Sequence, residues 1–221
     1  MNRRWIGPVL IVLMVAFALA VYGRLPEQVP THFDLSGKPD DWMDRFPGAF
    51  LMPAIAAGIY LLLFALRRID PRREHYQRFE DTYWVILNVL ALLMAVFHVL
   101  SLGLALGWPI DMGRAITVTI GLLFVGLGNY LPRIRSNWWI GIRTPWTLEN
   151  EAVWRETHRV GGFTFVTAGL VLVIAGLFVP PGPREWVSGI ALGVGVVVPL
   201  VYSYVAYRRV MATGRKGAEA S

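Results

Sequence analysis

Residues 115–131 read AITVTIGLLFVGLGNYL, an apolar run without Asp, Glu, Lys, Arg or His. A hydrocarbon core about 30 Å thick requires roughly 20 consecutive apolar residues in helical form, and this run approaches that length. Lipid offers the backbone no hydrogen-bond partners, so a segment that crosses it folds as a helix. The run therefore predicts a transmembrane helix.

Five further apolar runs surround this one. Of the 221 residues, 55% are hydrophobic and 16% are charged, whereas a soluble domain has roughly 25% charged residues. We predict an all-α polytopic membrane protein with six transmembrane helices, an ordered outer loop between helices 1 and 2, and a structured cytoplasmic loop between helices 4 and 5. The other five runs cover about residues 5–22, 47–66, 83–106, 162–179 and 186–207.

The first run also has features of a signal peptide. Arg3 and Arg4 precede it, and Ala18-Leu19-Ala20 resembles a small-residue cleavage site. We expect a retained helix, because the run is nearly long enough to span a bilayer and further spans follow. Cleavage would leave five spans in the same orientation.

Positive charge predicts the orientation. With the N-terminus in the cytoplasm, sixteen Lys and Arg residues fall inside and five outside, which also places the C-terminus inside. The net charge of +6 could indicate nucleic acid. Arginines that flank helices on the cytoplasmic side are better explained by anionic lipid, so we expect the lipid bilayer and no direct nucleic acid as a partner.

Several kinds of chemistry are excluded or unsupported. The chain has no cysteine, which excludes disulfides, zinc–thiolate sites and thiol catalysis. It also has no His-Glu-x-x-His, Gly-x-Ser-x-Gly or Walker pattern. We predict no catalytic residues, no cofactor and no metal. His32 and His158 are weak metal candidates, because neither lies in a spacing typical of a specific metal.

A polar, aromatic connector follows the run with which we began. Residues 137–148 read NWWIGIRTPWTL, and a simple loop between two membrane helices does not need three Trp. Thr147 is a plausible N-cap for a helix on which Trp154, Thr157 and His158 share one face. This connector is the first candidate site.

Asn88 and His98 are polar residues inside the third predicted span. Polar residues in a membrane usually face protein and often mark a pathway. A proton or substrate site and a neutral His bonded to a neighbouring helix are both compatible with the sequence. Gly189 and Gly193 form a Gly-x-x-x-Gly step that favours close helix packing, within the monomer or between copies.

Two regions carry a family resemblance. The connector resembles the signature of the SdpI-like family of membrane immunity proteins, and the first loop resembles an uncharacterised N-terminal module often fused to it. Arg45 and Arg133 stand where we would expect Lys. The connector positions that match are Gly128-Asn129, Pro132, Asn137, Gly141 to Leu148, Val153-Trp154, Thr157-His158-Arg159 and Gly162, and those in the loop are Leu25-Pro26, Pro30 to Phe33, Gly37 and Asp40.

The resemblance implies two modules, an N-terminal module (1–66) with an extracytoplasmic loop (23–46) and a four-helix membrane domain (67–211). The remaining tail (212–221) we expect from its sequence to be disordered. It implies a bacterial cytoplasmic-membrane protein that protects against a secreted peptide toxin. A cytoplasmic repressor held at the membrane, and with it signal transduction, is the further role that the resemblance implies.

Candidate residues follow on each side. On the extracytoplasmic side, where toxin or ligand would bind, they are Pro30, Thr31, His32, Phe33, Asp34, Gly37 and Asp40. On the cytoplasmic side, where a partner would bind, they are Asn129, Pro132, Asn137, Arg143, Thr144, Pro145, Trp146, Glu151, Trp154, Thr157 and His158.

Two other functions remain open. A small-molecule or lipid transporter would use the intramembrane His98 and Asn88. A membrane-embedded metal-dependent enzyme would use His32 or His158.

Overall fold

The structure is a computed structural model that describes residues 3–34 and 36–219, with side chains described as far as Ala212. Six helices in this part of the chain are long and apolar enough to cross a membrane. They contain all six runs identified from the sequence apart from one or two end residues, so the prediction of an all-α polytopic membrane protein is confirmed. The spans are Arg3–Arg24, Arg45–Ile69, Arg73–Ala105, Met112–Arg133, Glu151–Phe178 and Pro183–Ala212.

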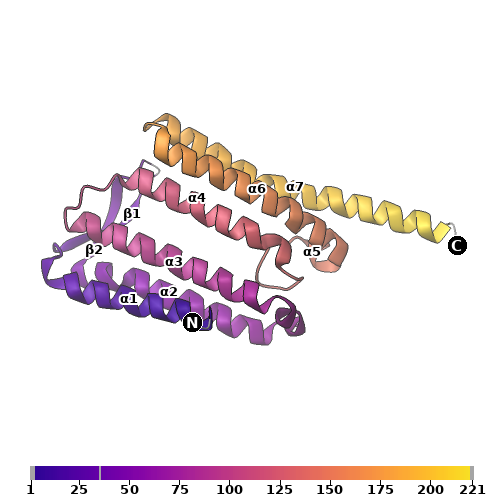
Figure 1. Cartoon of the computed structure of the whole chain (residues 1–221), viewed down its shortest axis with the longest axis horizontal. Coiled ribbons are helices and arrows are strands. Elements are labelled where there is room, and N and C mark those ends of the chain that lie inside the picture. Colours follow the sequence, from indigo (N-terminus) through magenta and orange to yellow (C-terminus); the bar gives the residue numbers. More distant parts are fainter. Residues whose placement is uncertain (1–2, 35, 220–221) are drawn as a thin grey trace.

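The long helices form two groups. Figure 1 shows α1, α2 and α3 on one side of the molecule and α4, α6 and α7 on the other. The predicted domain boundary between residues 66 and 67 stays a prediction. The bounds are α1 Ile6–Val21, α2 Arg45–Ile69, α3 Glu80–Ala105, α4 Met112–Tyr130, α6 Glu151–Phe178 and α7 Pro183–Glu219.

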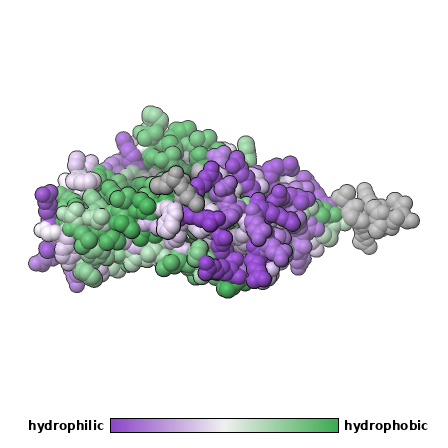
Figure 2. Space-filling view, turned by 60° about the horizontal axis from the view of Figure 1, so that its bottom comes forward, coloured by the Kyte–Doolittle hydropathy of each residue, from purple (hydrophilic) through white to green (hydrophobic). Residues whose placement is uncertain are grey.

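Large apolar side chains cover much of the outer surface of these helices. Leu61 is 65% exposed, Phe163 74% and Phe178 77%. A soluble monomer rarely exposes so much contiguous apolar surface, whereas a bilayer covers it. In Figure 2 hydrophilic residues gather instead over the centre and right of the view.

Glycines hold α4 against α6. A Cβ on Gly121 would lie 2.8 Å from the carbonyl oxygen of Gly169, and a Cβ on Gly128 would lie 2.8 Å from that of Gly162. The two backbones therefore approach so closely that only glycine fits, as in other small-residue helix contacts in membranes. The Gly189 and Gly193 step has open space around both residues instead.

One end of the bundle carries a small antiparallel sheet of β1 (Gln28–Phe33) and β2 (Pro39–Asp44), and we call it the hairpin end. Val29 of β1 is fully buried among Ala18, Ala49 and Leu102 of the three N-terminal helices. The turn between the strands lies against the start of α4, where a Cβ on Gly37 would overlap the backbone of Gly113. The sheet thus rests on both helix groups.

The opposite end, which we call the connector end, holds the 3-10 helix η3 (Arg73–Phe79), residues 134–144 and the short helix α5 (Pro145–Glu149). The backbone of α7 continues beyond the span to Glu219, into the expected tail (212–221). Residues 220 and 221 lie outside the described residues, as do the side chains from 213 onward, so disorder of the tail stays a prediction.

Candidate functional site

Asn137 organises the centre of the connector. Its side chain is fully buried, and its Oδ1 accepts hydrogen bonds from the backbone N–H groups of Trp139 (2.9 Å) and Ile140 (2.7 Å). Its Nδ2 donates to the carbonyl oxygens of Arg135 and Ile140, both at 2.9 Å. One amide side chain thus provides the partners that a helix or sheet would otherwise give to the backbone.

His158 and Trp154 support the connector from α6. The two rings stack with centroids 4.1 Å apart, and both side chains are at most 1% exposed. His158 Nδ1 donates to the Trp154 carbonyl at 2.9 Å, while its Nε2 accepts from the Ile142 N–H at 3.0 Å. Trp154 Nε1 donates to the carbonyl of Ile134 at 2.8 Å. Because Nε2 accepts, this His is neutral, with its proton on Nδ1.

Gly141 completes this contact. It has a φ of +119°, and a Cβ there would come within 3.0 Å of His158 Nε2. The conformation is one that L side chains rarely adopt. The backbone can therefore turn over the imidazole only because residue 141 has no side chain.

Two helix caps end the connector. Thr144 caps α5 through a capping box with Thr147, and Pro145 follows at the first helical position. Asn150 then caps α6, since its Oδ1 accepts from the N–H groups of Ala152 and Val153. The prediction that Thr147 is the N-cap is therefore wrong. The chain starts one short helix at Thr144 and a second, long one at Asn150.

A second set of residues, which the sequence did not single out, fastens the connector to the loop between α2 and α3. Asp70 is 2% exposed and its carboxylate accepts from the Trp138 N–H (3.0 Å) and the Tyr76 hydroxyl (2.9 Å). Arg72 donates to the Ser136 hydroxyl and to the Leu148 carbonyl (2.5 Å). Nothing local to Asp70 or Arg72 in the sequence signals contact with residues more than 60 positions away.

The predicted cytoplasmic residues thus divide by exposure. The structure brings them together at the connector end. Asn137, Trp154, Thr157 and His158 are buried, so any effect they have on a partner would act through the shape of the connector. The more accessible residues are Asn129, Pro132, Arg143, Thr144, Pro145, Trp146 and Glu151.

The connector's surface carries Arg143 and two indoles. Arg143 is exposed and donates to the Trp138 carbonyl at 2.5 Å, and Trp138 is 44% exposed. Trp146 is half-buried. Its Nε1 donates to the Ser203 hydroxyl at 2.6 Å, and its ring meets Tyr204 edge-on. Trp146 therefore joins α5 to α7 and leaves part of its ring on the surface.

At the hairpin end the seven predicted residues lie on the two strands and their turn. His32 Nδ1 lies 2.6 Å from Asp40 Oδ1, and both side chains are exposed. Pro30 is buried and its carbonyl accepts from the Ser101 hydroxyl at 2.6 Å. Thr31 and Phe33 are half-buried. The hairpin therefore presents a polar outer face and rests on α3.

Asp34 shapes the turn of the hairpin. Its carboxylate accepts from the Ser36 hydroxyl (2.7 Å) and from the N–H groups of Ser36 and Lys38. The hydrogen bond from the Ser36 hydroxyl, together with those from the backbone, lowers the pKa of Asp34. Gly37 follows with a φ of +86°, a conformation for which glycine is suited.

A buried arginine lies beside this turn. Arg184, at the start of α7, is 1% exposed, and its Nη1 lies 3.6 Å from Asp111 Oδ2. The hydrogen bond from the Arg114 N–H, aided by the charge of Arg184, lowers the pKa of Asp111. This ion pair ties the turn before α4 to the start of α7.

The intramembrane polar residues join α1 to α3. His98 is 1% exposed, donates from Nε2 to the Met14 carbonyl at 3.0 Å, and meets the Phe17 ring edge-on. Asn88 donates to the Arg3 carbonyl (2.8 Å) and accepts from the Gly7 N–H (2.9 Å). These contacts favour a structural role for both side chains.

Metal binding receives no support from the arrangement of acidic and histidine side chains. Among the described residues, no group of three or more such side chains is placed to hold a metal ion. His32 belongs to β1 at the hairpin end, and His158 belongs to α6 near the connector end (Figure 1).

The fold and the two ends define a class of protein, a multi-pass membrane protein with a polar structure at each end of an apolar bundle. Residues 133–203 match the SdpI/YfhL protein family, and residues 9–57 match a domain of unknown function, DUF1648. The predicted family resemblance is thereby confirmed. The first match begins at the connector, and the second covers the hairpin.

One curated relative extends the similarity over most of the chain. The chain is 24% identical over 178 residues to a protein named Immunity protein SdpI from Bacillus subtilis (strain 168). The alignment covers 80% of this chain and 83% of the relative. No solved structure matches the chain.

Proposed function

We propose that this protein is a membrane immunity protein that protects the cell that carries it from a secreted antimicrobial peptide. The observation that carries the proposal is the similarity to Immunity protein SdpI over 80% of the chain, beside family matches that include the connector and the hairpin. Six apolar spans, together with this similarity, support a multi-pass bacterial membrane protein. The excess of Lys and Arg at the connector end supports a cytoplasmic position for that end and for both termini.

The hairpin end would then meet the peptide outside the cell. Its exposed acids, Asp40, Asp41 and Asp44, lie beside Trp42, which is 49% exposed, and Phe46, which is 65% exposed. Acidic and aromatic side chains in one surface complement a cationic amphipathic peptide, since the charges attract it and the rings bind its apolar face.

The connector end would bind a protein partner in the cytoplasm. Arg143, Trp138 and Trp146 form a surface of the kind that binds protein partners, because Arg and Trp dominate the energetics of interfaces. We propose that this surface holds a cytoplasmic repressor, and that the buried Asn137, Trp154 and His158 keep the surface in one conformation.

Survival of a toxin-sensitive strain that expresses the protein tests the proposal. The peptide to use is the secreted toxin to which the SdpI-like immunity proteins confer resistance. Expression should raise survival, and the double variant Asp41→Asn with Trp42→Ala should lose that protection. Glu149→Gln, an exposed acid at the opposite end, is the matched control and should protect fully. Equal killing with and without the protein, at equal membrane abundance, would contradict immunity.

The inner surface requires a separate readout. Arg143→Ala with Trp138→Ala should keep protection but release the repressor, which co-purification with the detergent-solubilised protein measures. Loss of protection in this variant, with the partner still bound, would contradict the division of roles between the two ends.

A further inference from the structure

A groove runs between α1 and α2 from the connector end into the span. It has a volume of about 780 Å³. Its walls are apolar, with Pro8, Ile11 and Val12 from α1 and Ala57 and Leu61 from α2. Val12 and Leu61 are each 65% exposed although they lie within membrane spans. The groove therefore opens sideways into the region that acyl chains occupy.

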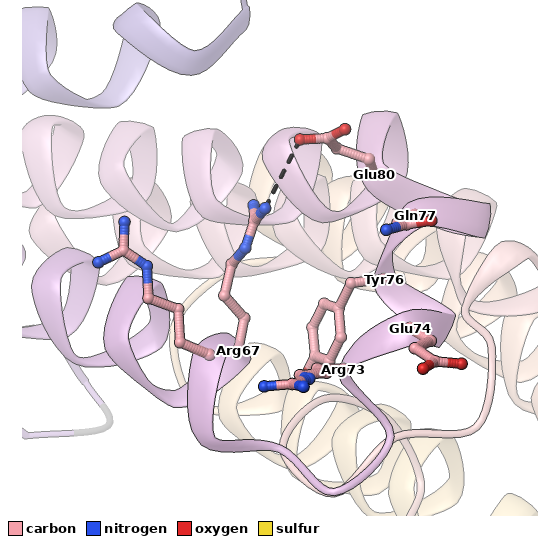
Figure 3. Close-up of a pocket in the computed structure, with 7 residues that line it drawn as sticks. Arg67, Arg73, Glu74, Tyr76, Gln77 and Glu80 are labelled. Atoms are coloured by element: carbon pink, nitrogen blue, oxygen red, sulfur yellow. Dashed lines mark ion pairs between the residues drawn. The ribbon is translucent and has the colours of Figure 1, made fainter.

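The groove's mouth is basic. Arg4, Arg67 and Arg68 line it together with Trp5 and Trp84. A second hollow, of about 480 Å³, adjoins it because Arg67 and Arg68 line both. Figure 3 shows Arg67 reaching across this hollow toward Glu80, with Arg73 and Glu74 on the η3 side. Four arginines thus face two glutamates, and positive charge is in excess.

The ion pairs in this region leave some of the arginine guanidinium groups without a carboxylate of their own. Glu80 is shared, since its Oε1 lies 2.9 Å from Arg4 Nη2 and 3.7 Å from Arg67 Nη2. Arg67 Nη1 is buried and has no hydrogen-bond partner among the described residues. Arg68 makes no ion pair in this part of the chain, and its guanidinium stacks 4.5 Å from the centroid of Phe64. A buried N–H without an acceptor costs free energy, so the site is suited to an additional anion.

We propose that this groove binds one anionic phospholipid, with its phosphate at Arg67 and Arg68 and an acyl chain along α1 and α2. The apolar wall and the basic mouth are continuous, and the arginines lie near the ends of the candidate spans, where lipid headgroups would meet them. Bidentate guanidinium groups match phosphate oxygens in geometry and charge. The site is distant from the hairpin and is independent of the proposed immunity.

Native mass spectrometry of the full chain in detergent tests the proposal directly. The protein is titrated with phosphatidylglycerol and, separately, with phosphatidylcholine of the same acyl chains. The wild type should bind the first lipid roughly 25-fold more tightly, since each of the two arginines near anionic lipid contributes about a factor of five. Glycerol phosphate at the same concentration should not displace it, because it has no acyl chain to fill the groove.

Two variants separate charge from shape. Arg67→Gln with Arg68→Gln should remove the preference for phosphatidylglycerol, while Arg208→Gln with Arg209→Gln, on α7 away from the groove, should change it less than twofold. Ala57→Phe keeps every arginine and fills the groove, so it should weaken binding of both lipids. Equal affinity for the two lipids would overturn the proposal. So would an Arg67/Arg68 variant that binds like the wild type, or an equal loss in the Arg208/Arg209 control.

Discussion

Gly141→Ala is the most direct probe of the connector. The residue has a φ of +119°, and a backbone conformation reserved largely for glycine costs a side-chain-bearing residue roughly 1–3 kcal/mol. The added Cβ also meets His158 Nε2 within 3.0 Å and so displaces the acceptor of the Ile142 N–H. An unsatisfied buried group adds about 1–3 kcal/mol. The sum, roughly 2–6 kcal/mol, is a large part of a typical folding free energy of about 5–15 kcal/mol.

Gly107→Ala is the matched control, because Gly107 has a φ of +82° but nothing within 4 Å of its missing Cβ. It carries the backbone cost without the contact with His158. In thermal unfolding of the detergent-solubilised protein, Gly141→Ala should melt roughly 2–12 °C below Gly107→Ala, from the additional 1–3 kcal/mol and about 2–4 °C per kcal/mol. Equal melting temperatures would refute the role of His158 beneath the glycine.

Three further predictions concern the rest of the molecule. Asn137→Ala should destabilise the protein by about 3 kcal/mol, since it removes both the acceptor and the donor contacts of this buried amide; chemical unfolding measures the loss. Gly169→Val should cost about 1–3 kcal/mol, because its Cβ would lie 2.6 Å from the Gly121 carbonyl, whereas Gly189→Val, with open space around it, should be neutral in thermal unfolding. The contribution of Asp34 to the hairpin should be complete above about pH 4 and be lost as pH falls through its lower native pKa; the NMR shift of the Lys38 amide follows it, and a midpoint above about pH 4 would contradict the hydrogen bonds described.

The six membrane-spanning helices could be predicted from the apolar runs of the sequence, because a run such as residues 115–131 is stable in lipid only as a helix. The pairing of Trp154 with His158 was also predictable, since residues four apart share a helix face. The cap at Thr144 had a usable signal in Pro145, which favours the first position of a helix.

Contacts between residues far apart in the chain could not be predicted from the sequence. Asp70 bonds to Trp138 across 68 positions, and no local pattern marks an acid as the partner of a distant backbone N–H. Gly189 and Gly193 match a motif for close helix packing, yet both have open space around them. The motif shows that another helix could pack closely there, but it does not show whether one does. The Arg67 groove likewise depends on how α1 meets α2.

The account depends most on the two polar ends lying on opposite sides of the membrane, the hairpin outside and the connector inside. The chain has no cysteine, so single cysteines can be placed without background at Asp41 and at Arg143, both exposed. In intact cells a membrane-impermeant maleimide should label the Asp41→Cys protein, and it should label the Arg143→Cys protein only after lysis. Labelling of Arg143→Cys in intact cells, with Asp41→Cys protected, would contradict the orientation and the roles assigned to the two ends.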